Sequence, residues 1–446
     1  MPVPVRRLAV GLGVVALAVT ACGPSATVEF RTVVPSGESR ATIVAQPSGE
    51  KKVQPAQRIT VTATDGQLAE VTVLGPKGPL KGAISPDGTT WTAQRSNLAF
   101  GTTYTVTATA IDQRGVSTTR TDAFRTVEPK DFVEASVLPS DGTTVGVGMP
   151  ITVTFDRPVK NKEEVERALV VSTPTPIEGA WSWTGDTVVR FRPKEYWPGD
   201  IDVTIATNLK GVKTSKGIFG DKNESTTFHI APSMVIKVNA ESHQAKVFQN
   251  GEKVRTIPVT TGKAGFETRS GNLIILTKEP TRIMDAATGG TDPNDPEYYR
   301  IEVQYAMRIT YSGEFLHAAP WSVGSQGFAN VSHGCIGMST TNAQWLFENA
   351  TIGDPVEVTG TSNPQNLGNG VTVWTTTWEE WLVDSATGPV LTTVQGAATP
   401  AAQDPSPAPE AVTGPQTTPV PHPTPEPSQE PSQDATDTVQ QAAFGR

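Results

Sequence analysis

The amino-acid sequence predicts a mainly β protein in which two β-sandwiches precede a third, β-rich domain. Apolar residues alternate with threonine and other polar residues, as in residues 104–108 and 151–155, and this period of two is typical of half-buried strands. Glycine, proline and aspartate divide these runs into short segments. A chain of 446 residues is also too long for one hydrophobic core, so several domains are expected.

The N-terminal residues 1–21 are predicted to be a cleaved lipoprotein signal peptide. Arg6 and Arg7 precede an apolar run over residues 8–19, which is shorter than a bilayer-spanning helix requires. Cys22 follows the sequence Val-Thr-Ala, which resembles the lipobox of bacterial lipoproteins and implies a lipid anchor on this cysteine. The alternative is an ordinary secretory signal with an incidental cysteine. The lipobox implies an extracytoplasmic protein that is anchored to the cell membrane.

Two stretches of the chain repeat one pattern, in which a glycine precedes a strand-like run. Residues 101–109 read Gly-Thr-Thr-Tyr-Thr-Val-Thr-Ala-Thr, and residues 199–207 read Gly-Asp-Ile-Asp-Val-Thr-Ile-Ala-Thr. Two tandem immunoglobulin-like sandwiches, at 50–128 and 130–232, fit this repeat. We expect them to act as spacers. Glycan or partner binding is the alternative, but no aromatic cluster requires it. The polar stretch 22–49 is predicted to be a tether.

Strand-like runs continue through residues 233–360 and predict the third domain. Asn250 and Gly251 separate two of these runs, which is a strong signal for a β-hairpin. A short helix is expected near the end of this domain, with Ser339 or Thr341 as its N-cap. The domain is therefore expected to be mostly β with one short helix.

Two segments of different composition complete the chain. Residues 361–396 contain Trp374, Trp378 and Trp381 and are too apolar for a linker. They are predicted to form a Trp-rich C-terminal subdomain that packs back on the third domain. Residues 397–446 are dense in proline, alanine, glutamine, serine and threonine, and cannot bury enough apolar surface to offset the entropy of ordering. This tail is predicted to be disordered or extended.

The charge and the cysteine count narrow the function classes. A formal net charge of −9 without a basic run does not suggest a nucleic-acid partner. If Cys22 carries a lipid, Cys335 is the one remaining thiol and has no partner for an intramolecular disulfide. An unpaired cysteine in an exported protein needs a reason, and a catalytic role is one.

The residues that indicate chemistry are His317, His333, Gly334 and Cys335. A thiolate is the reactive form of cysteine, so catalysis at neutral pH needs a basic neighbour. Histidine can accept the thiol proton and later return it to a leaving amine. Gly334 allows close backbone approach, and amides around Cys335 can donate to a developing oxyanion. The pattern predicts a cysteine nucleophile with a histidine as its base.

Each of these residues also has a structural interpretation. His317 can be a core histidine, His333 can hydrogen-bond its own loop, and Cys335 can be a small buried apolar residue. Their coincidence in an exported chain without a partner cysteine favours catalysis. A zinc site from the three side chains is chemically possible, but the sequence shows neither a fourth ligand nor a catalytic carboxylate in a metal motif. We therefore expect neither a metal nor a cofactor.

The same residues resemble the L,D-transpeptidase family, whose catalytic domains carry a histidine and, further along, Ser/Thr-His-Gly-Cys. Here these are His317 and the Ser-His-Gly-Cys run that ends at Cys335. The resemblance covers residues 233–360, and the order of lipobox, two sandwiches and Trp-rich segment is similar to multidomain actinobacterial members. It implies that Cys335 is the nucleophile and His317 the proton donor and acceptor, while His333 and Gly334 shape the site.

The resemblance also implies a set of substrate contacts and three departures from the family pattern. The residues that fall where family members bind the donor peptide, or in the flap over it, are Tyr299, Ser312, Gly313, Asn330, Met284 and Trp321. Gly337 stands where Asn or Arg is usual, Ala318 where Ser is common, and Gly289 where the flap often has an aromatic residue. Because a backbone carbonyl can orient the catalytic histidine, Ala318 is compatible with the expected base. The differences bear on pocket shape, rate and inhibitor response.

The implied reaction is a 3→3 cross-linking of peptidoglycan. Cys335 attacks the carbonyl of diaminopimelate in a donor tetrapeptide stem, D-Ala leaves, and the amine of a second diaminopimelate attacks the thioester. The expected partners are peptidoglycan stem peptides and carbapenem-type β-lactams as covalent inhibitors, and the expected location is the cell wall or periplasmic space. Three alternatives stay open: an L,D-carboxypeptidase that uses water, a transferase to another amine, and a catalytically decayed wall-binding module.

Overall fold

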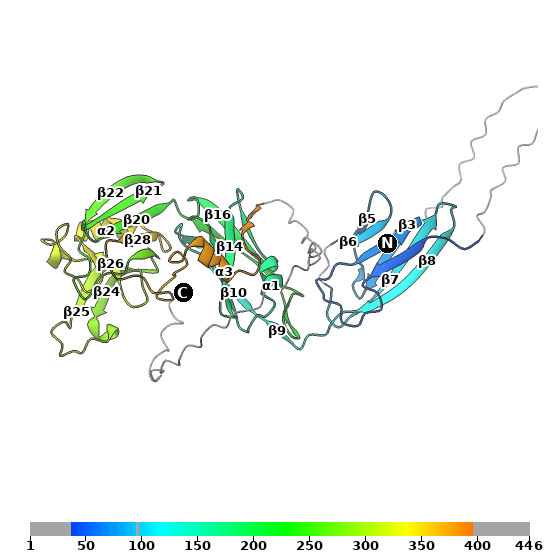
Figure 1. The fold of residues 1–446 in the computed structure, drawn as a ribbon, viewed down its shortest axis with the longest axis horizontal. Coiled ribbons are helices and arrows are strands. Elements are labelled where there is room, and N and C mark those ends of the chain that lie inside the picture. The colour runs from blue at the N-terminus through cyan, green and yellow to red at the C-terminus, as the bar shows by residue number, and fades with distance from the viewer. Residues whose placement is uncertain (1–36, 95–97, 396–446) are drawn as a thin grey trace, which may run out of the picture. The chain divides into compact units, whose positions relative to one another are not determined.

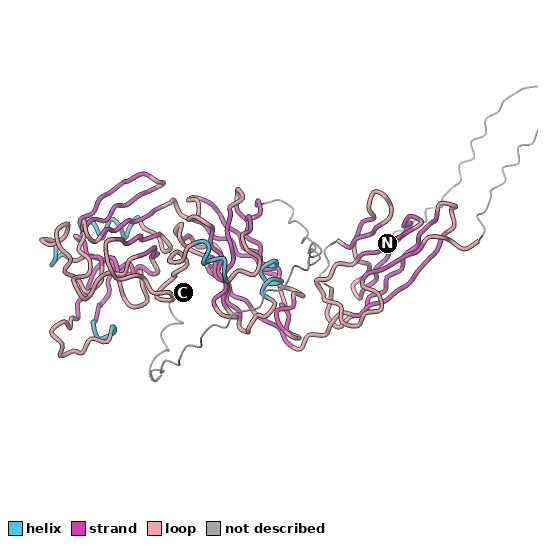
Figure 2. The backbone as a smooth tube through the Cα atoms, in the orientation of Figure 1, coloured by secondary structure: helices cyan, strands magenta, loops and turns pink. Residues whose placement is uncertain are grey.

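The structure is a computed structural model that describes residues 37–94 and 98–395, and it confirms the mainly β fold class (Figures 1 and 2). The signal peptide, Cys22 and the tail at 397–446 lie outside the described residues. The helices of the described part are short: α1 (Lys162–Ala168), α2 (Thr340–Asn349) and α3 (Trp378–Val383), with 3-10 turns η1 (Ala286–Gly289) and η2 (Pro320–Ser322). Within 37–94 and 98–395, no helix has the length and apolar character that a membrane crossing needs.

The first sandwich consists of two four-stranded sheets. One sheet is β1 (Thr42–Gln46), β2 (Thr60–Thr64), β6 (Thr90–Ala93) and β5 (Gly82–Ile84), and the other is β4 (Gly78–Pro79), β3 (Gly66–Gly75), β7 (Thr103–Asp112) and β8 (Ser117–Arg125). Strand β1 lies inside the segment 22–49 that the sequence analysis assigns to a tether. Ile43 and Ala45 alternate with exposed neighbours and enter the core, and the strand pairs with β2. The tether prediction is therefore wrong for residues 42–46.

The second sandwich has two five-stranded sheets and a small three-stranded one. The first large sheet consists of β10 (Ala135–Leu138), β12 (Ile151–Phe155), β15 (Val188–Pro193), β14 (Glu178–Thr184) and β29 (Val390–Leu391). The second large sheet consists of β11 (Thr144–Val145), β19 (Asn223–Ile230), β16 (Ile201–Asn208), β13 (Leu169–Thr173) and β30 (Thr393–Val394). The small sheet consists of β17 (Lys213–Ser215), β18 (Ile218–Gly220) and β9 (Asp131–Val133). Trp181, Phe191 and Trp197 are almost fully buried in its core. Large aromatic side chains of this kind bury a large apolar area.

The Trp-rich segment packs mainly on the second sandwich, so the prediction that it packs on the third domain is wrong for most of its length. Strands β29 and β30 extend the two large sheets by pairing with β14 and β13. The Trp374 indole donates to the Gly148 carbonyl at 2.7 Å and belongs to the same core. The physical reason is that the two sheets would otherwise leave open edges, which the returning chain covers. Contacts with the third domain come from residues 361–370, where the Ser270 amide donates to the Asn363 carbonyl at 2.7 Å, and from Trp374, whose carbonyl accepts from the Asn272 side chain at 3.4 Å.

The third domain is built on two mixed sheets that the helix α2 joins. The five-stranded sheet is β22 (Glu252–Pro258), β21 (Gln244–Gln249), β20 (Met234–Asn239), β28 (Pro355–Thr359) and β23 (Gly271–Ile274), and the four-stranded sheet is β24 (Thr277–Asp285), β25 (Arg300–Arg308), β26 (Phe315–Ala318) and β27 (Ile336–Met338). The hairpin at Asn250 and Gly251 is confirmed, with both residues at positive φ as a tight primed turn requires. Ser339 is the N-cap of α2 and accepts from the Asn342 amide.

Asp354 is a buried carboxyl in the turn before β28, beside residues 146–148 of the second sandwich. The Gly146 amide donates to the Ile352 carbonyl at 2.8 Å, and Asp354 is 1% exposed. Burial raises the pKa of Asp354 to about 7. The Asp354 carboxyl has a higher pKa in the folded state than in the unfolded state, so its protonated form favours the folded state. This stabilising contribution is fully present at low pH and is lost as the pH rises through about 7.

We therefore expect Asp354→Asn to stabilise the protein at pH 8 relative to wild type by an amount on the order of 4 kcal/mol at most, and to have little effect near pH 4. Thermal unfolding of both proteins at a series of pH values measures this difference. Asp221→Asn, a change at an exposed aspartate of the neighbouring second sandwich, is the control and should give no such difference between pH 4 and pH 8. A pH-independent difference for Asp354→Asn would contradict the assignment.

Candidate active site

The candidate nucleophile and base lie on one face of a parallel strand pair. Strands β26 and β27 align His317 with Gly337, and Cys335 directly precedes β27. Leu316 and Ile336 point into the main core of the domain, whereas Cys335 belongs to a separate small cluster on the other face. Because side chains alternate between the faces of a sheet, His317 and Cys335 share the face opposite the core. The topology thus brings together two residues that are eighteen positions apart.

The Cys335 thiol is buried and neutral at rest. It is 8% exposed and lies 3.8 Å from the Gly313 carbonyl, to which it donates. Met284 of β24 and Tyr299, which directly precedes β25, pack in the same cluster, and we call the segment 277–308 that carries both the flap. Burial raises the pKa of Cys335 to about 12, and the Phe315 backbone amide offsets this only in part. A nucleophilic thiolate at neutral pH therefore requires a base that removes the proton as the reaction proceeds.

His317 has the geometry of such a base. Its Nδ1 donates to the Ala318 carbonyl at 2.8 Å, so in the neutral imidazole Nε2 carries the free lone pair. Burial lowers the pKa of His317, which keeps the ring neutral at pH 7. The orienting group is a backbone carbonyl, and the missing serine hydroxyl at Ala318 is not needed for it. Trp321, more than half exposed, lies over the ring at 6.0 Å between centroids.

Backbone and hydroxyl contacts fix the loop that ends at Cys335. Gly334 has a φ of +119°, which favours glycine, and its carbonyl accepts from the Thr268 hydroxyl at 2.7 Å. The Ser332 hydroxyl donates to the Cys335 carbonyl at 2.6 Å. A side chain at Gly334 would also approach the Glu314 carboxylate at 3.5 Å. Because 3.5 Å is an ordinary contact distance, the backbone conformation and not a lack of space favours glycine here.

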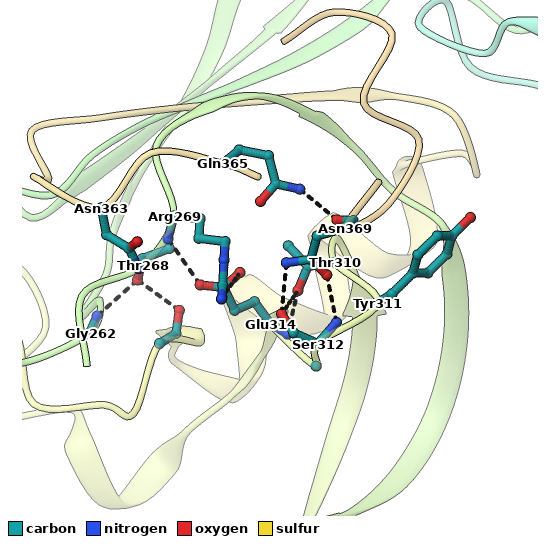
Figure 3. Close-up of polar contacts among 12 residues, drawn as sticks. Gly262, Thr268, Arg269, Thr310, Tyr311, Ser312, Glu314, Asn363, Gln365 and Asn369 are labelled. Atoms are coloured by element: carbon teal, nitrogen blue, oxygen red, sulfur yellow. Dashed lines mark hydrogen bonds and ion pairs between the residues drawn. The ribbon is translucent and has the colours of Figure 1, made fainter. Parts of the chain in front are cut away.

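Glu314 is a buried residue of the site that the sequence analysis missed. Its carboxylate accepts from the Arg269 amide at 2.9 Å and pairs with the Arg269 guanidinium at 3.2 Å (Figure 3). It is 5% exposed and directly follows Gly313, and its carboxylate lies near Gly334. An acidic residue beside glycine looks in sequence like part of an exposed turn, so no local signal marks it.

His333 faces the flap and contacts an acidic residue there. Its Nε2 lies 2.5 Å from Glu297, which also accepts from the Lys263 ammonium at 2.6 Å. Phe266 and Tyr299 flank the imidazole ring, with centroids at 4.7 Å and 5.0 Å. Lys263 and His333 together hold the pKa of Glu297 below its usual value. His333 thus ties the motif to the flap, as a residue that shapes the site, and Glu297 is a second residue that sequence patterns did not indicate.

The expected substrate residues separate into two groups. Met284, Tyr299 and Gly313 adjoin Cys335, and Ser312 lies beside Gly313 in the same turn. Asn330 differs, because its side chain is occupied within the protein. Its amide donates to the Ala240 carbonyl at 3.0 Å and its oxygen accepts from the Thr261 amide at 3.1 Å. The structure therefore gives Asn330 a role in holding the loop before the motif, which differs from the expected donor contact.

Gly337 also has a structural explanation. A Cβ at this position would lie 3.0 Å from both the Ala319 Cβ and the Thr260 Cγ2, which is closer than most Cβ contacts. Its backbone exchanges two hydrogen bonds of 2.9 Å with Thr260. The local packing thus favours glycine at this position. In the part of the chain that the structure describes, no group of three or more His, Cys, Asp or Glu residues is arranged to hold a metal ion.

Comparisons with known proteins agree with this architecture. Residues 233–358 match the L,D-transpeptidase catalytic domain, and residues 50–213 match the bacterial Ig domain. L,D-transpeptidase 2 of Mycobacterium tuberculosis is 37% identical over 330 residues, which cover 74% of this chain and 80% of that protein. L,D-transpeptidase 5 of the same species is 34% identical over 346 residues, with 76% and 75% covered.

A solved structure of an L,D-transpeptidase in complex with imipenem is 39% identical, covers 52% of this chain and 99% of that one, and has a TM-score of 0.44. The long, high-coverage matches to the two mycobacterial proteins extend through the Ig-like and catalytic regions alike. The catalytic-domain match also contains both His317 and Cys335. The chain therefore belongs to the L,D-transpeptidase family.

Proposed function

We propose that this protein forms 3→3 cross-links in peptidoglycan through a thioester on Cys335. The observation that carries the proposal is the shared strand face of Cys335 and a neutral His317 whose Nε2 is free to accept a proton. A buried neutral thiol on the same strand face as an oriented neutral imidazole is suited to proton transfer during attack, and needs no stable ion pair at rest.

In the first half-reaction the Cys335 sulfur attacks the carbonyl of the donor diaminopimelate while His317 Nε2 takes the thiol proton. The tetrahedral intermediate then collapses: the bond to the terminal D-Ala nitrogen breaks, and the imidazolium gives its proton to that leaving amine. Hydrogen-bond donors near the turn that contains Gly313, together with the backbone amide of Cys335, are proposed to stabilise the oxyanion. The products are a thioester, free D-Ala and a neutral imidazole.

In the second half-reaction a diaminopimelate side-chain amine of a neighbouring stem attacks the thioester. His317 accepts the proton of the attacking amine and returns it to the Cys335 sulfur as the C–S bond breaks, so the enzyme is regenerated. Attack by water instead gives an L,D-carboxypeptidase, and attack by another amine gives a different transferase. A carbapenem, which mimics the acyl donor, is proposed to acylate the same sulfur.

The remaining parts of the chain fit an enzyme of the cell envelope. We propose that Cys22 carries a lipid anchor and that the two Ig-like sandwiches act as spacers that raise the catalytic domain from the membrane toward the wall. The acidic net charge of the chain gives it no electrostatic attraction to nucleic acids.

Intact-protein mass spectrometry of the soluble form tests the function, with a carbapenem in one reaction and a disaccharide tetrapeptide in another. The expected results are a covalent adduct that is absent in Cys335→Ala, and a cross-linked dimer that has lost one D-Ala. A tripeptide product without dimer would identify the carboxypeptidase. A folded protein that gives neither adduct nor turnover would reject the enzymatic function and favour a decayed wall-binding module.

A further inference from the structure

The C-terminal segment 361–370 is hydrogen-bonded to the turn that faces Cys335. The turn spans residues 310–313 between β25 and β26, and its Gly313 carbonyl is the acceptor for the Cys335 thiol. Asn369, fifty-six residues after Gly313 in the sequence, makes two hydrogen bonds to this turn (Figure 3). Its side-chain oxygen accepts from the Ser312 amide at 2.8 Å, and its side-chain nitrogen donates to the Ser312 hydroxyl at 2.9 Å.

Asn369 is itself held firmly from the other side. Gln365, 6% exposed, donates from its side-chain amide to the Asn369 carbonyl at 2.5 Å, and its own backbone amide donates to the Ser270 carbonyl at 2.9 Å. Asn363 contacts the same region, because its side chain donates to the Glu267 carbonyl at 2.7 Å. The segment is thus fixed to the chain ahead of β23 and presents Asn369 to the turn.

The other bonds of the turn are made mainly at its flanks: the Arg308 guanidinium donates to the Thr310 and Tyr311 carbonyls at 3.2 Å and 3.1 Å, and the Glu314 amide donates to the Thr310 hydroxyl at 2.9 Å. The Gly313 amide donates to the Thr310 carbonyl at 3.3 Å, and Gly313 has a φ of +103°, a conformation that side-chain-bearing residues rarely adopt. The position of the Gly313 carbonyl relative to the thiol therefore depends on how the preceding residue is held. Asn369 holds the amide and the hydroxyl of that residue together.

We propose that Asn369 is a positioning residue, which fixes the Ser312 and Gly313 turn against Cys335 for reaction with the acyl donor. The proposal rests on the proposed function, in which Cys335 is acylated. The proposal also fixes the direction of the hydrogen bonds that the Ser312 hydroxyl makes. Because the hydroxyl oxygen accepts from the Asn369 side-chain amide, the hydroxyl hydrogen remains available to the neighbouring Thr310 hydroxyl or to a substrate oxygen. Misplacing a reactive geometry by about 1 Å can reduce a rate by about 100-fold.

The test compares the second-order rate of acylation by a carbapenem, measured by intact mass, in wild type, Asn369→Ala, Asn369→Asp and Asn366→Ala. Asn369→Ala should be about 10-fold to 100-fold slower, yet reach complete acylation at long times. Asn369→Asp keeps the acceptor for the Ser312 amide and should recover a large part of the rate. Asn366 is exposed in the same segment, and Asn366→Ala should leave the rate unchanged.

Thermal unfolding supplies a readout that separates positioning from folding. Because the two lost hydrogen bonds are partly exposed, the Tm of Asn369→Ala should fall by only about 2–4 °C. An Asn369→Ala rate equal to that of wild type overturns the proposal. So does a slow variant with incomplete final acylation and no recovery in Asn369→Asp, since that pattern indicates a general loss of structure. A wild type that is not acylated at all would instead reject the proposed function.

Discussion

His317→Gln is expected to slow the acylation of Cys335 by about 100-fold to 10,000-fold, the range that a positioned general base contributes. Glutamine can occupy the space and donate to the Ala318 carbonyl, but it cannot accept the thiol proton. Burial raises the pKa of Cys335 to about 12, so the thiol does not ionise unaided at neutral pH. The second-order rate constant with a carbapenem, from time-resolved intact mass, gives the ratio of variant to wild type.

His229→Gln is the matched control, since His229 lies on the second sandwich, where it contacts Asp202 and Asp200 at 2.9 Å and 3.4 Å. This variant should be acylated at the wild-type rate. An equal loss of rate in both variants would show an effect of histidine replacement that is unrelated to proton transfer. A His317→Gln rate within a few-fold of wild type would mean that another group, or the substrate itself, removes the proton.

The pH dependence of the wild-type rate follows from the same electrostatics. The pKa of His317 is lowered by burial, so the fraction of neutral base increases with pH and has its midpoint below the usual histidine value of about 6.5. The acylation rate should therefore rise with pH in the acidic range and be level from about pH 7 to about pH 9. A continued rise across pH 8 to 9 would point to direct ionisation of the Cys335 thiol instead.

Local sequence signals were sufficient for much of the fold and for the centre of the site. The hairpin at Asn250 and Gly251 and the N-cap at Ser339 each depend on one or two residues whose conformational preferences are strong. His317 and Cys335 were predicted from chemistry, because an unpaired thiol near histidines, in a chain that is predicted to be exported, has few structural explanations. The parallel pairing of β26 and β27 then places them on one face.

Local sequence signals could not predict the contacts between segments that are distant in the sequence. Asn369 and Glu297 act on the site from surface loops whose composition is ordinary, and only the fold shows that one reaches Ser312 and the other His333. Asn330 shows the opposite case, since a resemblance indicated a donor contact while its side chain bonds to Ala240 and Thr261. Side-chain hydrogen bonds of this kind depend on tertiary geometry, which neither periodicity nor turn chemistry determines.

The Trp-rich segment illustrates the same limit, because three tryptophans predict burial but not the surface that buries them. Trp374 is 8% exposed in the core of the second sandwich. Its indole ring lies 4.6 Å from Tyr196 and 4.7 Å from the Arg192 guanidinium, measured to ring centroids. Strands β29 and β30 then follow it into the two sheets of that sandwich. The segment is thus an integral part of the fold and should contribute strongly to its stability.

Trp374→Ala is accordingly expected to destabilise the second sandwich by about 3–5 kcal/mol, the cost of deleting a buried tryptophan, since the cavity adds to the lost burial and the Gly148 carbonyl loses its donor. Calorimetry of the intact soluble protein measures the shift of the transition. Trp378→Ala is the matched control: this indole is half-buried and stacks 5.3 Å from Arg192, so its removal should cost about 1 kcal/mol. Equal effects of the two substitutions would contradict the packing of Trp374 in this core.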